Sequence, residues 1–192
     1  CIGYGIDDCG VCHISFIWDE WNNLMDACGV CDGNNESMDE NGCCPDEVYI
    51  FNNCYNVQNT TELYYVPSDW TGNEIPPEIA SLVNLEELRL YNDNLSGEIP
   101  SWIGTLTNLE VIDFRNNQLT GEIPPELGNL VNLKDLRLGN NNLTGEIPDL
   151  SNLTALQHLR IEENQLTGEI PGHLANLGTE HSLSTLFLYT NQ

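Results

Sequence analysis

The stretch NLSGEIP at residues 94–100 returns three times in nearly the same form. It reads QLTGEIP at 118–124, NLTGEIP at 142–148 and QLTGEIP at 165–171. Aligning the copies places leucines at residues 85, 109, 133 and 156, in steps of 24, 24 and 23 residues. A fixed period of this length is typical of a solenoid, in which each repeat forms one coil of a stack. One coil cannot bury its own apolar edge, so the sequence predicts a stack with a shared leucine interior.

Each unit reads Leu-x-x-Leu-x-Leu-x-x-Asn-x-Leu-x-Gly-x-Ile-Pro, and each position has a physical role. The alternation in LRL (88–90) and IDF (112–114) predicts short strands whose apolar side chains point inward. Stacked coils would pair these strands into a parallel sheet with about 4.8 Å between neighbours. The asparagine after each strand is expected to turn inward and satisfy backbone groups that the bend leaves unpaired. Glycine permits the tight turn, and proline fits a stretch that needs no backbone donor.

This pattern is similar to that of leucine-rich repeat proteins, in particular the plant-type subclass with LxxLxLxxNxLxGxIP repeats. The resemblance covers residues 60–192, with looser units starting at Thr60 and Leu183 and the last one incomplete. It implies an α/β-type solenoid, a right-handed leucine-rich repeat superhelix with a short-stranded parallel sheet on its concave face. Asp93 and Ser68 stand where the pattern has asparagine, which puts an internal asparagine ladder in question at those coils.

Residues 1–59 differ in composition from the repeats, because they hold all eight cysteines, 11 acidic residues and no lysine or arginine. Such a segment has too little apolar material for a core of its own, so cross-links or bound ions are expected to hold it. An even number of cysteines in this setting favours disulfides and an extracellular location, secreted or at the cell surface. The predicted disulfide cysteines are Cys1, Cys9, Cys12, Cys28, Cys31, Cys43, Cys44 and Cys54.

Two short motifs in this front segment suggest metal binding. The runs DDCGVC (7–12) and DACGVC (26–31) give a Cys-x2-Cys-x15-Cys-x2-Cys spacing that falls within the range of zinc sites. Four further cysteines share the segment, so disulfides are favoured over zinc. The acidic stretch at 32–45 resembles the Asp-rich, disulfide-tied calcium repeats of thrombospondin-type secreted modules. That resemblance implies Ca²⁺ bound with the help of Asp26, Asp32, Asn34 and Asp39, and the alternative is a solvated acidic loop.

The stretch 43–65 resembles the N-terminal cap of leucine-rich repeat arrays. The resemblance implies a bridge from the cap, for which Cys44 with Cys54 is the preferred pair. The expected domain organisation is therefore a Cys-rich acidic module at 1–42, a cap at 43–59 and repeats at 60–192. Five sequons are candidate glycosylation sites, at Asn35, Asn59, Asn94, Asn142 and Asn152.

The outward strand positions form columns on the predicted concave face. One column reads Tyr64, Arg89, Asp113, Arg137, Arg160 and Phe187, and the next reads Val66, Tyr91, Arg115, Gly139, Glu162 and Tyr189. All four arginines of the chain lie here, and its only lysine, Lys134, does not. Arg and Tyr are favoured at binding hot spots, which makes Tyr64, Arg89, Tyr91, Asp113, Arg115, Arg137, Arg160, Phe187 and Tyr189 the candidate ligand contacts. The alternative is that Arg89, Arg137 and Arg160 pair with Glu87, Asp113, Asp135 and Glu162 across neighbouring strands.

Charge and composition narrow the function. The net charge of −25 argues against nucleic acid or an anionic membrane as a partner. No apolar run approaches the roughly 18 residues of a membrane-spanning helix, so no membrane insertion is expected. The chain opens on Cys1 without a leader pattern, so we expect that any secretion signal has been removed or lies outside it. Four scattered histidines and an open sheet do not suggest a catalytic pocket, so the chain is not expected to be an enzyme or to need a cofactor other than Ca²⁺.

Two functions remain open at this point. The first is an extracellular recognition or adhesion module that binds a protein or glycan on the concave face, which follows from the family resemblance. The second is a structural subunit of a head-to-tail extracellular filament or surface layer. The last unit stops at Asn191 and Gln192, halfway through its coil, and an uncapped end of this kind would allow self-association.

Overall fold

The computed structural model describes residue 41, residues 43–64, residue 66, residues 71–172, residue 174 and, for the backbone alone, residues 185–187. The chain divides into two compact units, Cys1–Asn56 and Val57–Gln192. Each unit is described by itself.

The described part of the first unit is a disulfide-linked hairpin. Strands β1 (Glu47–Ile50) and β2 (Asn53–Asn56) pair antiparallel around a tight turn. The turn residues Phe51 and Asn52 have φ of 49° and 63°, the positive values that two-residue hairpin turns require. Ile50 and Phe51 are buried beside this turn.

The disulfide of this hairpin corrects the predicted pairing. Cys54 is bonded to Cys43, with 5.5 Å between the Cα atoms, and not to Cys44. Cys44 is disulfide-bonded as well. Neighbouring side chains of an extended chain point to opposite sides, so only one of two adjacent cysteines can face Cys54. Which of the two faces Cys54 depends on the direction in which the chain enters the hairpin.

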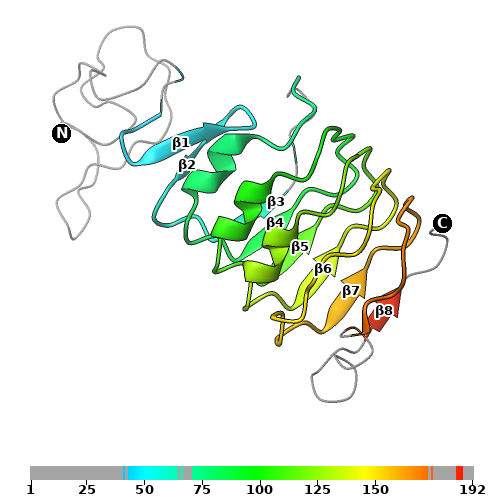
Figure 1. Cartoon of the computed structure of the whole chain (residues 1–192). Coiled ribbons are helices and arrows are strands. Elements are labelled where there is room, and N and C mark those ends of the chain that lie inside the picture. Colours follow the sequence, from blue (N-terminus) through cyan, green and yellow to red (C-terminus); the bar gives the residue numbers. More distant parts are fainter. Residues whose placement is uncertain are drawn as a thin grey trace, which may run out of the picture. The chain divides into compact units, whose positions relative to one another are not determined.

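The second unit is built on a six-stranded parallel sheet in which strand order follows sequence order (Figure 1). Its strands are β3 (Glu62–Tyr64), β4 (Glu87–Arg89), β5 (Val111–Asp113), β6 (Asp135–Arg137), β7 (His158–Arg160) and β8 (Thr185–Phe187). Pairing is in register, with Leu63, Leu88, Ile112, Leu136, Leu159 and Leu186 each opposite the next. The predicted stack of inward-facing residues is confirmed, and each strand begins one residue earlier than the pattern predicted.

In the described part of the chain, three 3₁₀-helices close the side of the coils away from the sheet (Figure 1). They are η1 (Pro77–Ser81), η2 (Ser101–Thr105) and η3 (Pro125–Asn129). Each follows the proline of an Ile-Pro pair, and these prolines have φ of −64°, −72° and −65°. Proline fixes this angle before folding, which prepares the chain for a helical turn. The fourth coil is one residue shorter, and residues 147–157 contain no such helix.

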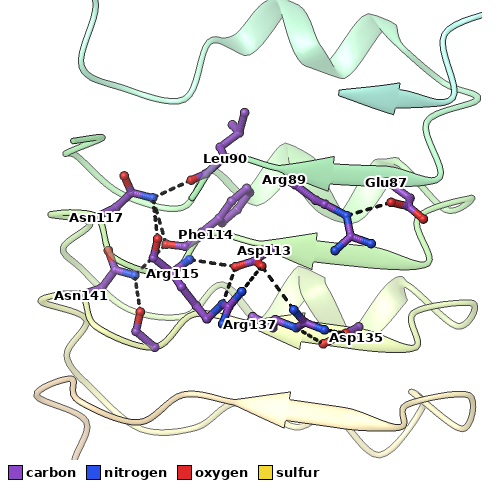
Figure 2. A network of polar contacts seen from close by, with 11 residues as sticks. Glu87, Arg89, Leu90, Asp113, Phe114, Arg115, Asn117, Asp135, Arg137 and Asn141 are labelled. Carbon is purple, nitrogen blue, oxygen red and sulfur yellow. Dashed lines mark hydrogen bonds and ion pairs between the residues drawn. The ribbon is translucent and has the colours of Figure 1, made fainter. Parts of the chain in front are cut away.

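An asparagine ladder runs through the interior beside the strands (Figure 2). The side-chain amide of Asn141 donates to Phe114 O at 2.9 Å and to Leu138 O at 3.0 Å, and its Oδ1 accepts from Leu119 N at 3.1 Å. Asn117 and Asn164 make the equivalent contacts one coil before and one coil after. The predicted inward turn of these residues is therefore confirmed.

Asp93 occupies the ladder position of the preceding coil, and its side chain does not complete the ladder. A carboxylate has no hydrogen to donate to the carbonyl groups that Asn117 reaches. Its Oδ2 is buried and accepts no hydrogen bond in the described part of the chain. Burial raises the pKa of Asp93 above its ordinary value, against a smaller opposing effect of a backbone hydrogen bond with Val66.

We expect Asp93→Asn to stabilise the protein at neutral pH by about 1 kcal/mol, because an amide can donate to the ladder carbonyls and carries no buried charge. A carboxyl group with a raised folded-state pKa favours the folded state when protonated. Its contribution is complete below the unfolded-state pKa and is lost as pH rises through the folded-state pKa. The gain from Asp93→Asn should therefore shrink as pH falls to about 4. Urea unfolding of both proteins across this pH range measures the difference, and a constant difference would contradict this assignment.

A second ladder joins the Gly-Glu segments of successive coils. Isolated parallel bridges pair Glu98 with Thr120, Glu122 with Thr144 and Glu146 with Thr167. At Gly121 the φ is 75°, and an added Cβ would lie 2.8 Å from Cγ of Glu98. Only glycine has both the backbone freedom and the space for this approach of two coils.

Candidate binding face

The outer face of the six-stranded sheet carries the first predicted column, whose side chains the structure describes from Tyr64 to Arg160. Strand register places Tyr64, Arg89, Asp113, Arg137, Arg160 and Phe187 opposite one another along the sheet. These residues flank the central leucines in sequence, and alternation along a strand sends them to the opposite face. We call this surface the concave face. The repeat period alone therefore places in one sheet residues that are more than 100 positions apart in the chain, from 64 to 187.

Asp113 lies at the centre of this face and anchors two arginines (Figure 2). Arg115 donates from Nε to Oδ1 at 2.8 Å and from Nη2 to Oδ2 at 2.6 Å. The Nη1 atom of Arg137 lies 3.6 Å from Oδ2 of Asp113, and Arg137 also donates through Nε and Nη2 to Asp135. The Asp113 side chain is only 1% exposed. The hydrogen bonds with Asp113 raise the pKa of Arg115.

Asp113 was predicted as a ligand contact, and its burial gives it a different place in the site. It lies beneath the arginine side chains and holds them in position. Removing either the buried carboxylate or its guanidinium partners is expected to destabilise the fold strongly, because the charge that remains is left uncompensated.

At the N-terminal end of the face, Glu87 joins Tyr64 to Arg89. Its Oε2 accepts from Nε of Arg89 at 2.8 Å and from the hydroxyl of Tyr64 at 2.8 Å. The guanidinium of Arg89 lies 5.9 Å from the centroid of the Tyr64 ring. The hydrogen bond from Arg89 lowers the pKa of Glu87. Partial burial, together with the carboxylates of Glu87 and Glu62, raises the pKa of Tyr64 to about 12.

The predicted alternative of ion pairing describes Arg89 and Arg137 well. The geometry differs from the expectation in one respect, since each arginine pairs mainly with the carboxylate two residues away on its own strand. Arg115 follows the same rule with Asp113. The three arginine side chains keep 22–29% of their surface exposed. They are therefore oriented by the protein before any ligand arrives.

Among the described residues of this face, two tyrosines are the exposed large hydrophobic side chains. Tyr64 is 44% exposed and Tyr91 is 49% exposed. Val66 was predicted to point outward in the second column and is instead buried, at 8% exposure. Gly139 leaves that column without a side chain at its position, and a Cβ added there would lie 2.9 Å from the carboxylate of Glu162. Tyr189 lies outside the described residues.

One contact of the face escaped the sequence analysis. Glu62 is exposed and faces outward beside Tyr64, because the two residues are two apart on β3. The same spacing joins Arg89, Arg115 and Arg137 to their carboxylate partners, so a search for polar pairs two residues apart would have found these contacts and that of Glu62 with Tyr64. A further asparagine series, Asn84, Asn108 and Asn132, also escaped attention, and it donates to Gln58 O, Val83 O and Thr107 O of the preceding coils.

Several predicted sites fall beyond the described chain. The candidate calcium ligands Asp26, Asp32, Asn34 and Asp39 lie there, as do Asn35 and the cysteines before Cys43. The other sequon asparagines, Asn59, Asn94, Asn142 and Asn152, are exposed. One described group, Cys43, Glu47 and Cys54, brings its ligand atoms within 4.8 Å, but the two sulfurs are bonded to each other and offer no thiolate. Among the described helices, none has the length and apolar character needed to cross a membrane.

The sequence profile of the leucine-rich repeat region family matches residues 39–192. The chain has no significant match among curated protein sequences. Among solved structures it is similar to the PEPR1–AtPEP1 complex, with 39% identity and a TM-score of 0.58 over 62% of this chain and 16% of that chain. It is also similar to the plant peptide hormone receptor RGFR1 in complex with RGF2, with 34% identity and a TM-score of 0.59 over 68% and 19% of the two chains.

A third similar structure is the leucine-rich repeat ectodomain of the receptor kinase SOBIR1 from Arabidopsis thaliana, with 33% identity and a TM-score of 0.60 over 67% of each chain. The chain thus spans less than a fifth of PEPR1 and RGFR1, at 16% and 19%, and two thirds of the SOBIR1 ectodomain.

Proposed function

Because this chain belongs to the leucine-rich repeat family, we propose that it is an extracellular recognition module that binds a protein partner on its concave face. The observation that carries the proposal is a continuous face on which Tyr64 and Tyr91 are exposed and carboxylates already orient three arginines, Arg89, Arg115 and Arg137. Side chains fixed before binding lose little conformational entropy when a partner arrives, so more of the contact energy becomes affinity.

The comparisons support a protein partner. PEPR1 and RGFR1 are both seen in complex with a named ligand, and RGFR1 is a peptide hormone receptor. The cysteine-rich composition of the front segment and the disulfide of Cys43 with Cys54 support an oxidising, extracellular location. A role as a filament subunit was predicted from the uncapped last unit, which stops at Asn191 and Gln192, and these two residues lie outside the described part.

Blocking the centre of the face tests the proposal. Gly139→Gln adds bulk to the bare position, and only the flexible end of Glu162 has to move. The matched control is Val131→Gln, at a site that is 51% exposed and outside the concave face. A partner would first be enriched on the native protein from the extracellular fluid of the source and purified, and its affinity for each variant would then be measured by surface plasmon resonance.

We expect Gly139→Gln to raise the Kd about tenfold or more and Val131→Gln to leave it unchanged. Equal affinity for the native protein and the Gly139→Gln variant would show that the partner binds elsewhere.

A further inference from the structure

The concave face has a surplus of negative charge in spite of its arginines. Strands β3 to β7 and the positions that follow them contribute five carboxylates and four guanidinium groups to this face. These are Glu62, Glu87, Asp113, Asp135 and Glu162, against Arg89, Arg115, Arg137 and Arg160. Arg89, Arg115 and Arg137 make ion pairs within this face. The chain as a whole carries −25, and its remaining cation, Lys134, pairs with Glu110 at 2.6 Å.

The surplus coincides with the exposed aromatic rings. Glu62, Tyr64, Glu87, Arg89 and Tyr91 form what we call the tyrosine site, at the N-terminal end of the face. It holds two carboxylates, one guanidinium and two tyrosines with nearly half of their surface in solvent. Partial burial, together with the two carboxylates beside its hydroxyl, raises the pKa of Tyr64. Aromatic faces and carboxylates are the two groups that attract a lysine or arginine side chain.

From this charge complementarity we propose that the tyrosine site binds a basic side chain of an extended peptide segment of the partner. The inference rests on the proposed function and adds to it that the ligand is positively charged. An acidic ligand would have to take Arg89, Arg115 or Arg137 from a carboxylate that already holds it, inside a protein of strongly negative charge. A basic ligand gains from that charge at a distance as well as in contact, since opposite charges accelerate encounter.

The dimensions of the sheet set the size of the probe. Six strands about 4.8 Å apart span roughly 24 Å, which an extended peptide crosses with about seven or eight residues at 3.3 Å each. The experiment uses two sets of immobilised synthetic peptides of about ten residues. Each pair has the same sequence, with lysine at the charged positions in one set and glutamate in the other. Binding of the full chain is measured at low and at physiological salt.

Four variants accompany the native protein. Tyr64→Ala with Tyr91→Ala removes both rings, and Glu62→Gln removes one exposed carboxylate. The matched control is Val83→Ala with Val131→Ala, two exposed side chains of 51% each that lie off the face. Arg89→Ala removes the positive charge of the tyrosine site and tests whether this arginine binds the glutamate peptides. Circular dichroism establishes that each variant keeps the fold before binding is compared.

We expect the best lysine peptides to bind at least tenfold more tightly than their glutamate partners, with affinity falling as salt rises. The double tyrosine variant should lose about tenfold or more, Glu62→Gln should lose less, and the valine control should lose nothing. Stronger binding of the glutamate set, abolished by Arg89→Ala, would overturn the inference and leave the proposed function standing. Native affinity of the double tyrosine variant for lysine peptides would also overturn it. Failure of both sets would remove the basic-peptide inference, while the Gly139→Gln experiment decides the proposed function separately.

Discussion

Asn141→Ala is expected to lower the free energy of unfolding by about 3 kcal/mol. The residue is 8% exposed, and its side chain makes four hydrogen bonds to backbone groups of two coils, one of them a long bond to Gly139 O. Phe114 O and Leu138 O would each keep one asparagine donor, from Asn117 and Asn164. The buried N–H of Leu119 would lose its acceptor, and a buried donor without a partner carries the full cost of its desolvation. Urea unfolding followed by circular dichroism measures the loss.

The neighbouring residue provides the control. Asn142 is exposed, and its Oδ1 accepts one long hydrogen bond, 3.4 Å from Gln165. Asn142→Ala should change the free energy of unfolding by less than about 0.5 kcal/mol. If the two alanine variants were equally stable, the inward asparagine would have no structural role and the ladder would be wrong.

Leu136→Ala is expected to cost a similar amount, about 2–5 kcal/mol. Leu136 is fully buried and lies in register between Ile112 and Leu159 of the adjacent coils. Those coils are held at a fixed spacing by the sheet and by the asparagine ladder, so they cannot close on the space that the leucine leaves. The midpoint of urea unfolding should fall while the slope stays nearly constant.

Val131→Ala is the matched control for this change, because it also removes part of an aliphatic side chain but at a position that is 51% exposed. Its effect should stay below about 0.5 kcal/mol. A loss at Leu136 no greater than that at Val131 would mean that the coils do not share one interior.

The sequence predicted the parts of this fold that repeat. A leucine every 24 or 23 residues is enough to align the strands, because a parallel stack has only one register that buries every leucine. The same argument placed Arg89, Asp113 and Arg137 in one column and turned Asn141 inward. Each of these placements follows from the repeat period, which occurs several times in the sequence.

The parts that occur once were not predictable in the same way. Whether Cys43 or Cys44 meets Cys54 depends on a single turn of the chain, and no second copy of that turn exists to compare. Val66 keeps the column position of Tyr91 but turns inward, at the first coil of the stack. The carboxylate partners of the arginines were named correctly in part, yet the choice between a partner on the same strand and one across the sheet is a matter of side-chain geometry.

The pairing of the arginines changes what the face is expected to recognise. Four cations gathered on one surface of an acidic protein first suggest an anionic ligand. The structure gives Arg89, Arg115 and Arg137 carboxylate partners and leaves Tyr64 and Tyr91 as the exposed contacts. Binding through these tyrosines would be governed by ring contact and by the remaining negative charge.

Both the binding face and the ligand inference depend on one arrangement, in which successive coils place their strands side by side in register. Nuclear Overhauser effects between backbone protons test it most directly, for the neighbouring pairs Leu88–Ile112, Ile112–Leu136 and Leu136–Leu159. We expect contacts for all three pairs and none between Leu88 and Leu136, which are two strands apart at about 9.6 Å. Missing contacts between these neighbours, or contacts that are shifted by one residue, would contradict the stack and every column built on it.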